Sequence, residues 1–147
     1  MLLKRGELLL VADAVQRLDV EGCPPLYCLR ADLPILETCH SDPVVVGEES
    51  TTAPVLLAPL DPLIYDRRVT SALWQFDYTW EAYTPPRRRR RGYYALPVLA
   101  GTAIVGHVDP KADRPARRLR IMARAVKRGH KIASALDQLA GWLGLRR

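Results

Sequence analysis

Residues 60–114 constrain the fold most, because short apolar and aromatic stretches alternate there with turn residues and arginines. The stretch 76–83 predicts one β-strand, the stretch 93–99 predicts a second, and a third strand ends within 109–114. The acidic and then basic run 61–68 predicts a loop before them. Strands that are joined by short turns predict an antiparallel sheet or a small barrel.

Two further elements follow this stretch. Residues 117–124 alternate between apolar and basic side chains, which predicts a half-buried strand with a basic outer face. Apolar residues at positions 132, 136, 139 and 143 recur at helical spacing and predict a helix over 130–145. Pro97 lies inside the second strand, and it predicts an edge position or a bulge because proline has no N–H to donate. We therefore expect an α+β fold in which a small antiparallel β-barrel is closed by a C-terminal helix.

The residues before this body predict a smaller part. The segments 7–11 and 15–20 predict two strands joined by a turn, and Asp32 can cap a short helical turn that ends at Leu36 or Glu37. The polar and acidic segment around 40–53 is the best boundary. We predict a first part at 1–39, a linker at 40–53 and the barrel domain with its closing helix at 54–147.

The charge of the chain is distributed unevenly. Residues 1–60 carry four Lys or Arg against nine Asp or Glu, a net charge of −5. Residues 61–147 carry eighteen against seven, which gives +11 and a total of +6. Such a field favours a polyanionic partner, either nucleic acid or an anionic membrane surface.

The arginine run 87–91 lies between Pro85-Pro86 and Gly92, which places it in a loop between two strands. Its five guanidinium groups would hold several phosphates without reading sequence; the structural alternative is a solvated hairpin tip. Asp66 beside Arg67 and Arg68 indicates either a phosphate contact or an ion pair that braces the loop, and Lys111 and Arg114 present the same choice. The candidate DNA-binding residues are Arg67, Arg68, Arg87, Arg88, Arg89, Arg90, Arg91, Lys111 and Arg114.

Aromatic residues lie close to these arginines. Tyr93-Tyr94 and the pair Trp80 and Tyr83 form a combination that can stack exposed bases. Strand alternation favours the other interpretation, in which one residue of each neighbouring pair is buried in the core.

Other kinds of site have weaker signals. Cys23, Cys28 and Cys39 are odd in number, which fits a reducing cytoplasm better than a disulfide framework. Together with His40 they lack the spacing of a zinc site, so we expect no metal and no cofactor. No Ser/His/Asp set, glycine-rich phosphate loop or paired-carboxylate motif indicates a catalytic residue. No apolar run reaches the length of a membrane-spanning helix, so a membrane is not an expected partner.

Six sequence blocks occur in order along the chain: RGEL (5–8), LAPLDPLIYDRR (57–68), FDYTWEAYTP (76–85), RGYYALPVL (91–99), VGHVDPKADR (105–114) and LAGWLGL (139–145). Together with the return at Pro25-Leu26-Tyr27, these blocks resemble the C-terminal part of the YcaQ/AlkZ family of winged-helix DNA glycosylases, which act on alkylated and crosslinked DNA. The resemblance implies tandem winged helices packed on a C-terminal β-barrel, with the hairpin of residues 1–39 as the remnant of a wing. It also implies excision of bases by cleavage of the N-glycosidic bond.

In that family, cleavage is tied to a Gln–apolar–Gln or Gln–apolar–Asp motif near the N-terminus of a much longer chain. Gln75-Phe76-Asp77 has this pattern, but it falls inside the separate FDY block, and we interpret it as coincidence. We therefore expect that the catalytic N-terminal part is missing and that double-stranded DNA is the partner of an inactive binding module. One alternative is a scaffold that packs against winged helices on another chain, or as a homodimer, without binding DNA. Another is a standalone glycosylase with a relocated active site.

Overall fold

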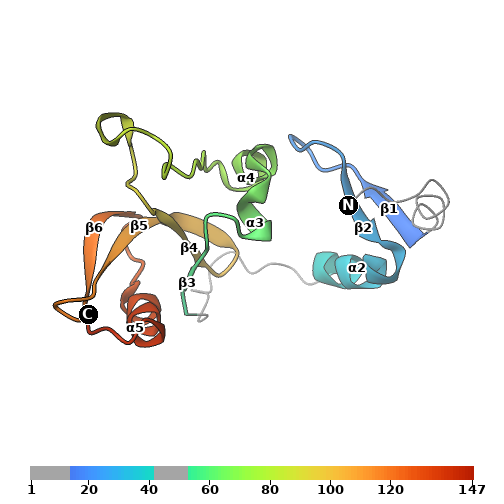
Figure 1. Cartoon of the computed structure of the whole chain (residues 1–147). Helices are drawn as coiled ribbons and strands as arrows, with labels where there is room; N and C mark the ends of the chain where they lie inside the picture. Colours follow the sequence, from blue (N-terminus) through green and yellow to red (C-terminus); the bar gives the residue numbers. More distant parts are fainter. Residues whose placement is uncertain (1–13, 42–52) are drawn as a thin grey trace. The chain divides into compact units, whose positions relative to one another are not determined.

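A computed structural model of the 147-residue chain describes residues 14–41 and 53–147. The chain divides into two compact units, Met1–Glu48 and Glu49–Arg147, and each is described by itself (Figure 1). Among the described residues, no helix has the length and apolar character that crossing a bilayer requires.

The first unit contains a hairpin followed by a helix. Strands β1 (Val15–Leu18) and β2 (Leu26–Leu29) pair antiparallel, with Val15 opposite Leu29. The 3-10 turn η1 (Arg30–Asp32) leads into α2 (Leu33–Ser41), which continues beyond the predicted end at Glu37. The strand expected at 7–11 lies outside the described residues, and the winged-helix interpretation stays a prediction.

The second unit is built on a four-stranded antiparallel sheet in the order β3-β4-β5-β6. Its long strands are β5 (Ala103–Asp113) and β6 (Arg118–Val126), which confirms the strands expected there. Strand β4 (Leu96–Ala100) begins three residues later than predicted, and β3 (Val55–Leu56) has only two residues.

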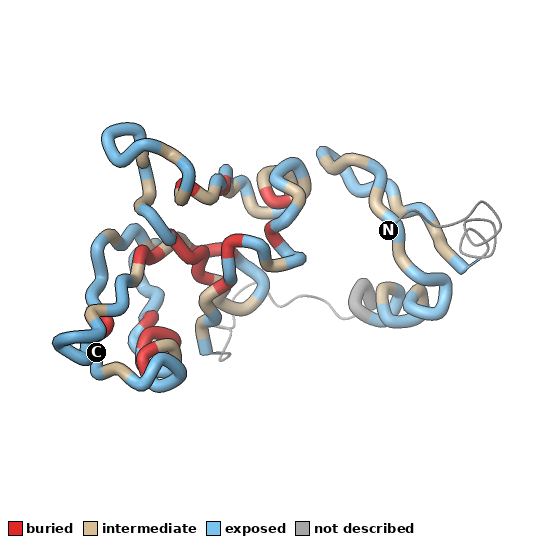
Figure 2. The backbone as a smooth tube through the Cα atoms, viewed as in Figure 1, coloured by how far each residue is buried: buried red, intermediate tan, exposed pale blue. Residues whose placement is uncertain are grey.

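Both faces of the sheet are covered. On one face, Ile132, just before α5 (Ala133–Trp142), and Leu136 within that helix pack against Val98 and Val108. On the other face, Leu57, Ile64 and Tyr78 pack against Ile104. They come from the chain around α3 (Pro62–Tyr65) and α4 (Arg67–Trp74) and from the extended segment that follows. Figure 2 shows the buried positions gathered on the central strands and on α5.

The predicted barrel is wrong, because the sheet is open. β3 pairs only with β4 and β6 only with β5, and no described strand joins these two edges. Two paired residues in β3 give too little length for the tilt and stagger that closure needs. The outer edge of β6 is met instead by the chain after α5, where the Leu119 N–H donates to the Arg146 carbonyl at 2.7 Å.

Two local predictions are also wrong. Residues 76–83 pair with no strand, although their side chains alternate as in a strand: Phe76 and Tyr78 face the core while Asp77 and Thr79 are exposed. The loop expected at 61–68 contains α3 and the start of α4. Aspartates cap both helices, because Asp61 accepts the Leu63 N–H and Asp66 accepts the Arg68 N–H.

Pro97 lies inside the sheet, in an interior strand, with a bulge directly after it between Val98 and Leu99. Its carbonyl accepts the Leu57 N–H at 2.9 Å, so this residue's hydrogen-bonding side faces the short strand β3. The missing N–H of Pro97 faces the same way, since both backbone groups of a strand residue point to one side. The ladder between β4 and β5 therefore loses no bond.

Candidate nucleic-acid interface

The arginine loop is anchored first by a buried glutamate. Glu81, only 7% exposed, accepts hydrogen bonds from the backbone N–H groups of Arg90, Arg91 and Gly92 at 2.8 to 3.2 Å. Burial acts to raise the pKa of this carboxyl, but the three N–H groups and the Arg91 charge outweigh it, and the pKa of Glu81 is lowered. The glutamate is therefore ionised at neutral pH and holds the loop by its backbone.

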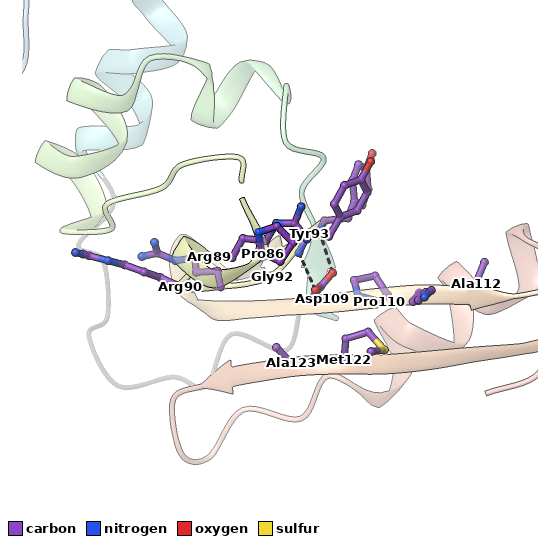
Figure 3. A pocket seen from close by; sticks show the side chains of 13 residues that line it. Pro86, Arg89, Arg90, Gly92, Tyr93, Asp109, Pro110, Ala112, Met122 and Ala123 are labelled. Atoms are coloured by element: carbon purple, nitrogen blue, oxygen red, sulfur yellow. Dashed lines mark hydrogen bonds between the residues drawn. The ribbon is translucent and has the colours of Figure 1, made fainter. Parts of the chain in front are cut away.

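A second buried carboxylate continues the anchor. Asp109 on β5, 6% exposed, accepts the Tyr93 N–H and the Tyr94 N–H, both at 3.0 Å (Figure 3). The loop approaches this side chain so closely that a Cβ on Gly92 would lie 2.0 Å from Asp109 Oδ2. Gly92 also has φ of +136°, a conformation that side chains disfavour. Only glycine fits there without a shift of the loop.

The five arginines divide into two groups. Arg89 and Arg91 are half-buried: Arg89 donates from Nε to the Thr84 carbonyl at 2.8 Å, and Arg91 lies 5.1 Å from the centre of the Phe76 ring. Arg87, Arg88 and Arg90 are exposed. Within the described part of the chain, none of the five guanidinium groups forms an ion pair with a carboxylate.

Beside this loop lies a groove of about 820 Å³ between the arginine loop and the strands β5 and β6. We call it the arginine groove. Figure 3 shows Pro110 and Asp109 on one strand with Met122 and Ala123 on the next, below the loop. Its lining residues are Pro86, Arg89, Arg90, Arg91, Gly92, Tyr93, Tyr94, Asp109, Pro110, Lys111, Ala112, Met122 and Ala123.

Of the predicted residues, Arg89, Arg90, Arg91 and Lys111 line the arginine groove, and Arg67, Arg68, Arg87, Arg88 and Arg114 do not. Arg68 forms an ion pair with Asp66 at 2.8 Å, the bracing arrangement that the sequence also allowed. The hydrogen bonds from Arg68 lower the pKa of Asp66 to about 2. Arg67 is exposed and lines a different hollow, and Arg114 is exposed in the turn between β5 and β6.

The expectation that one residue of each neighbouring aromatic pair is buried is wrong for Tyr93-Tyr94, whereas in the other pair Trp80 packs against the core. Tyr93 and Tyr94 are 56% and 41% exposed, and Tyr83 is 89% exposed. Strand alternation does not apply to residues 93 and 94 because β4 begins only at Leu96. The Tyr93 ring instead supports Arg89, whose guanidinium carbon lies 5.0 Å from the ring centre.

Groups that would support other chemistry are not assembled in the described residues. They contain no cluster of three or more His, Cys, Asp or Glu side chains that could hold a metal ion. Cys23 and Cys28 are free thiols, and the side chains of Cys39 and His40 lie outside the described set. In the Gln75-Phe76-Asp77 triplet, Asp77 accepts the Ser71 hydroxyl at 3.0 Å, and none of the three lines the arginine groove.

Sequence reasoning missed the anchoring roles of Glu81 and Asp109. A single glutamate after a tryptophan carries no motif, and its burial results from contacts with a loop nine to eleven residues away. One signal was available for Asp109: it is an acidic residue inside an apolar strand, Val105 to Pro110, where an unpaired carboxylate would be costly.

Comparison with known proteins identifies a matching protein family. A family model described as DNA glycosylase AlkZ-like matches residues 3–144, nearly the whole chain. No solved structure matches the chain.

Proposed function

Because the chain belongs to the AlkZ-like DNA glycosylase family, we propose that its second unit binds duplex DNA through the phosphate backbone at the arginine groove. The observation that supports this most is the use of the two buried carboxylates. Glu81 and Asp109 bind backbone N–H groups of the loop, so Arg87, Arg88 and Arg90 keep their charges for a partner.

The anchored loop is suited to a polyanion. Five consecutive N–H groups are fixed, so the loop is ordered before it meets a ligand and loses less conformational entropy on binding. Exposed guanidinium groups on such a base form strong, charge-assisted hydrogen bonds with phosphate oxygens. Contacts of this kind fix the position of a duplex without reading its sequence.

We propose that this unit holds DNA without cutting the N-glycosidic bond itself. A general base must reach the proton of an attacking water with a free acceptor. Asp109, the acidic side chain that lines the arginine groove, is only 6% exposed and each of its oxygens accepts a loop N–H, so it offers little surface to an attacking water. An excision assay of the full chain on N7-alkylated duplex should then release no base, and turnover would contradict this part of the proposal.

Binding is tested by measuring the affinity of the full chain for a short duplex over a range of salt concentrations. The logarithm of the association constant should fall linearly with the logarithm of salt, by about 0.9 for each phosphate contact. In the triple variant Arg87→Gln, Arg88→Gln, Arg90→Gln, this slope should be shallower by about 3, and affinity should fall at every salt concentration.

A matched control separates local contact from overall charge. The variant Arg118→Gln, Arg124→Gln, Arg128→Gln removes an equal number of charges from exposed positions on and just after β6, outside both the arginine loop and the lining of the arginine groove. It should leave the slope within about 1 of the original value. Equal effects of the two triple variants, or no binding at low salt, would refute the proposal. Co-purification of a partner chain without DNA binding would select the scaffold alternative.

A further inference from the structure

A second hollow lies in the same unit and shares no lining residue with the arginine groove. Its volume is about 390 Å³, which lies near the lower end of the range for small-molecule sites, roughly 300–1,000 Å³. We call it the tyrosine pocket. It is lined by Pro59, Leu60, Ile64, Tyr65, Arg67, Tyr78, Trp80 and Tyr83.

Two of its aromatic rings are left in water. Tyr65 is 72% exposed and Tyr83 is 89% exposed, while Tyr78 is buried at 3%. The Tyr78 hydroxyl donates to the Ala95 carbonyl at 2.8 Å, and burial raises its pKa to about 12. The pocket therefore has one fixed, neutral ring that is held by the sheet and two exposed rings that are free to cover a flat ligand.

Trp80 connects the tyrosine pocket to the arginine groove. Its ring meets Tyr83 edge to face at 5.7 Å, and it meets Tyr94 in the same manner at 6.1 Å. Tyr83 lines the pocket and Tyr94 lines the groove. The indole Nε1–H is buried and has no hydrogen-bond partner in the described part of the chain.

Arg67 supplies the positive charge at this pocket. It begins α4 and is exposed, and no described carboxylate pairs with it, whereas its neighbour Arg68 is held by Asp66. A ligand that combines a flat aromatic ring with an adjacent negative charge matches this set of groups.

We propose that the tyrosine pocket holds a single unstacked nucleobase of a DNA strand whose neighbouring phosphates lie in the arginine groove. The base stacks on the exposed tyrosine rings, and Arg67 contacts the phosphate of the same nucleotide. Stacking on aromatic side chains tolerates any base, because every base has a π-face. The inference rests on the proposed DNA binding, and it adds a preference for DNA that contains an unpaired base.

The test compares two duplexes of the same sequence, one fully paired and one with a single bulged nucleotide. Their affinities for the full chain are measured by fluorescence anisotropy at one salt concentration. The wild type should bind the bulged duplex about 5- to 150-fold more tightly, the gain expected from stacking one base. Tyr83→Ala and Tyr65→Ala should bring this ratio close to 1 and leave affinity for the paired duplex unchanged. Tyr83→Phe should keep the preference.

Trp142→Ala serves as the matched control, because Trp142 is an exposed aromatic residue, at 79%, on α5 at the opposite face of the sheet. It should not change the ratio. Equal affinity of the wild type for both duplexes would overturn the base pocket and leave phosphate binding intact. A preference that survives in both tyrosine-to-alanine variants would overturn it as well. Absence of binding to either duplex would refute the proposed function together with this inference.

Discussion

Glu81 and Asp109 divide five consecutive backbone N–H groups between them: Glu81 accepts those of residues 90 to 92, and Asp109 accepts those of residues 93 and 94. The two carboxylates come from different elements, the extended segment after α4 and the strand β5. They tie the arginine loop to the sheet without using a single guanidinium group. The loop's order and its positive charge are therefore controlled by separate residues and can be altered independently.

Gly92→Ala should destabilise the second unit by about 2–4 kcal/mol, because it combines an unfavourable positive φ with displacement of the Asp109 carboxylate. Urea unfolding followed by tryptophan fluorescence measures this, since Trp74, Trp80 and Trp142 all lie in the second unit. Gly141→Ala is the control: it lies in α5 with no atom within 4 Å of the added Cβ, so it should be neutral or stabilising by up to about 1 kcal/mol. Equal unfolding midpoints for Gly92→Ala and wild type would show that the loop can accommodate a Cβ at position 92 beside Asp109.

Glu81→Gln should lower the free energy of unfolding by about 1.5–3 kcal/mol, since the charged acceptor of three N–H groups is lost. The pH dependence has a defined sign. The pKa of Glu81 is lowered in the folded state, so its stabilisation is complete above the usual value of 4.5 and is lost as pH falls below it. The variant should lose that acid-dependent part of the stability. If the free energy of unfolding decreased equally for wild type and variant between pH 5 and pH 3, this role of Glu81 would be contradicted.

The C-terminal half of the fold is well predicted from local pattern. The alternation in 117–124 predicts the strand β6, but of its apolar positions only Leu119 is buried and Ile121 is exposed, because a bulge opposite Asp109 and Pro110 shifts the register there. The apolar stripe at 132, 136 and 139 faces the core at α5, whereas Leu143, just after the helix, is exposed. The segment 76–80 shows the limit of this reasoning. Its side chains do alternate between buried and exposed. Such alternation shows that the backbone is extended and that every second side chain faces the core, but it does not show whether a neighbouring strand pairs with it. A closed barrel depends on that pairing, so the sequence pattern could not establish it.

The candidate site is predicted only in part for a similar reason. A run of five arginines indicates a basic loop, but it does not tell which side chains are free. Arg89 and Arg91 are held by Thr84 and Phe76, residues that precede them by five and fifteen positions. The short helices in 61–74 could not be recognised from the sequence, because aspartates and arginines are as common in loops as at the capped start of a helix. Tertiary contacts decide between these outcomes.

His107 predicts a second pH dependence at a higher pH. Its burial, followed by the nearby Arg91 charge, lowers its pKa below the usual 6.5. The unfolded chain then binds a proton more readily than the folded one, so stability should decrease as pH falls from about 6.5. His107→Asn should remove the decrease between pH 6.5 and pH 5, a window above the titration of Glu81. Unfolding curves at half-unit pH steps measure it; an unchanged slope in the variant would assign the effect to another group.

Glu81→Gln provides a test in which anchoring and Coulomb attraction predict opposite results. The substitution raises the net charge from +6 to +7, and long-range attraction alone would strengthen DNA binding slightly. Loss of the anchor should instead weaken binding by about 3- to 10-fold, because the loop must be ordered when DNA arrives.

Asp137→Asn is the matched control: it adds the same charge at an exposed position on α5, where Asp137 pairs with Arg147 at 3.1 Å. Affinity for a paired duplex is measured for both variants at one salt concentration and at a temperature where both are folded. Weaker binding in Glu81→Gln, with unchanged or tighter binding in Asp137→Asn, would show that loop order governs the contact; tighter binding in both would show that charge alone does.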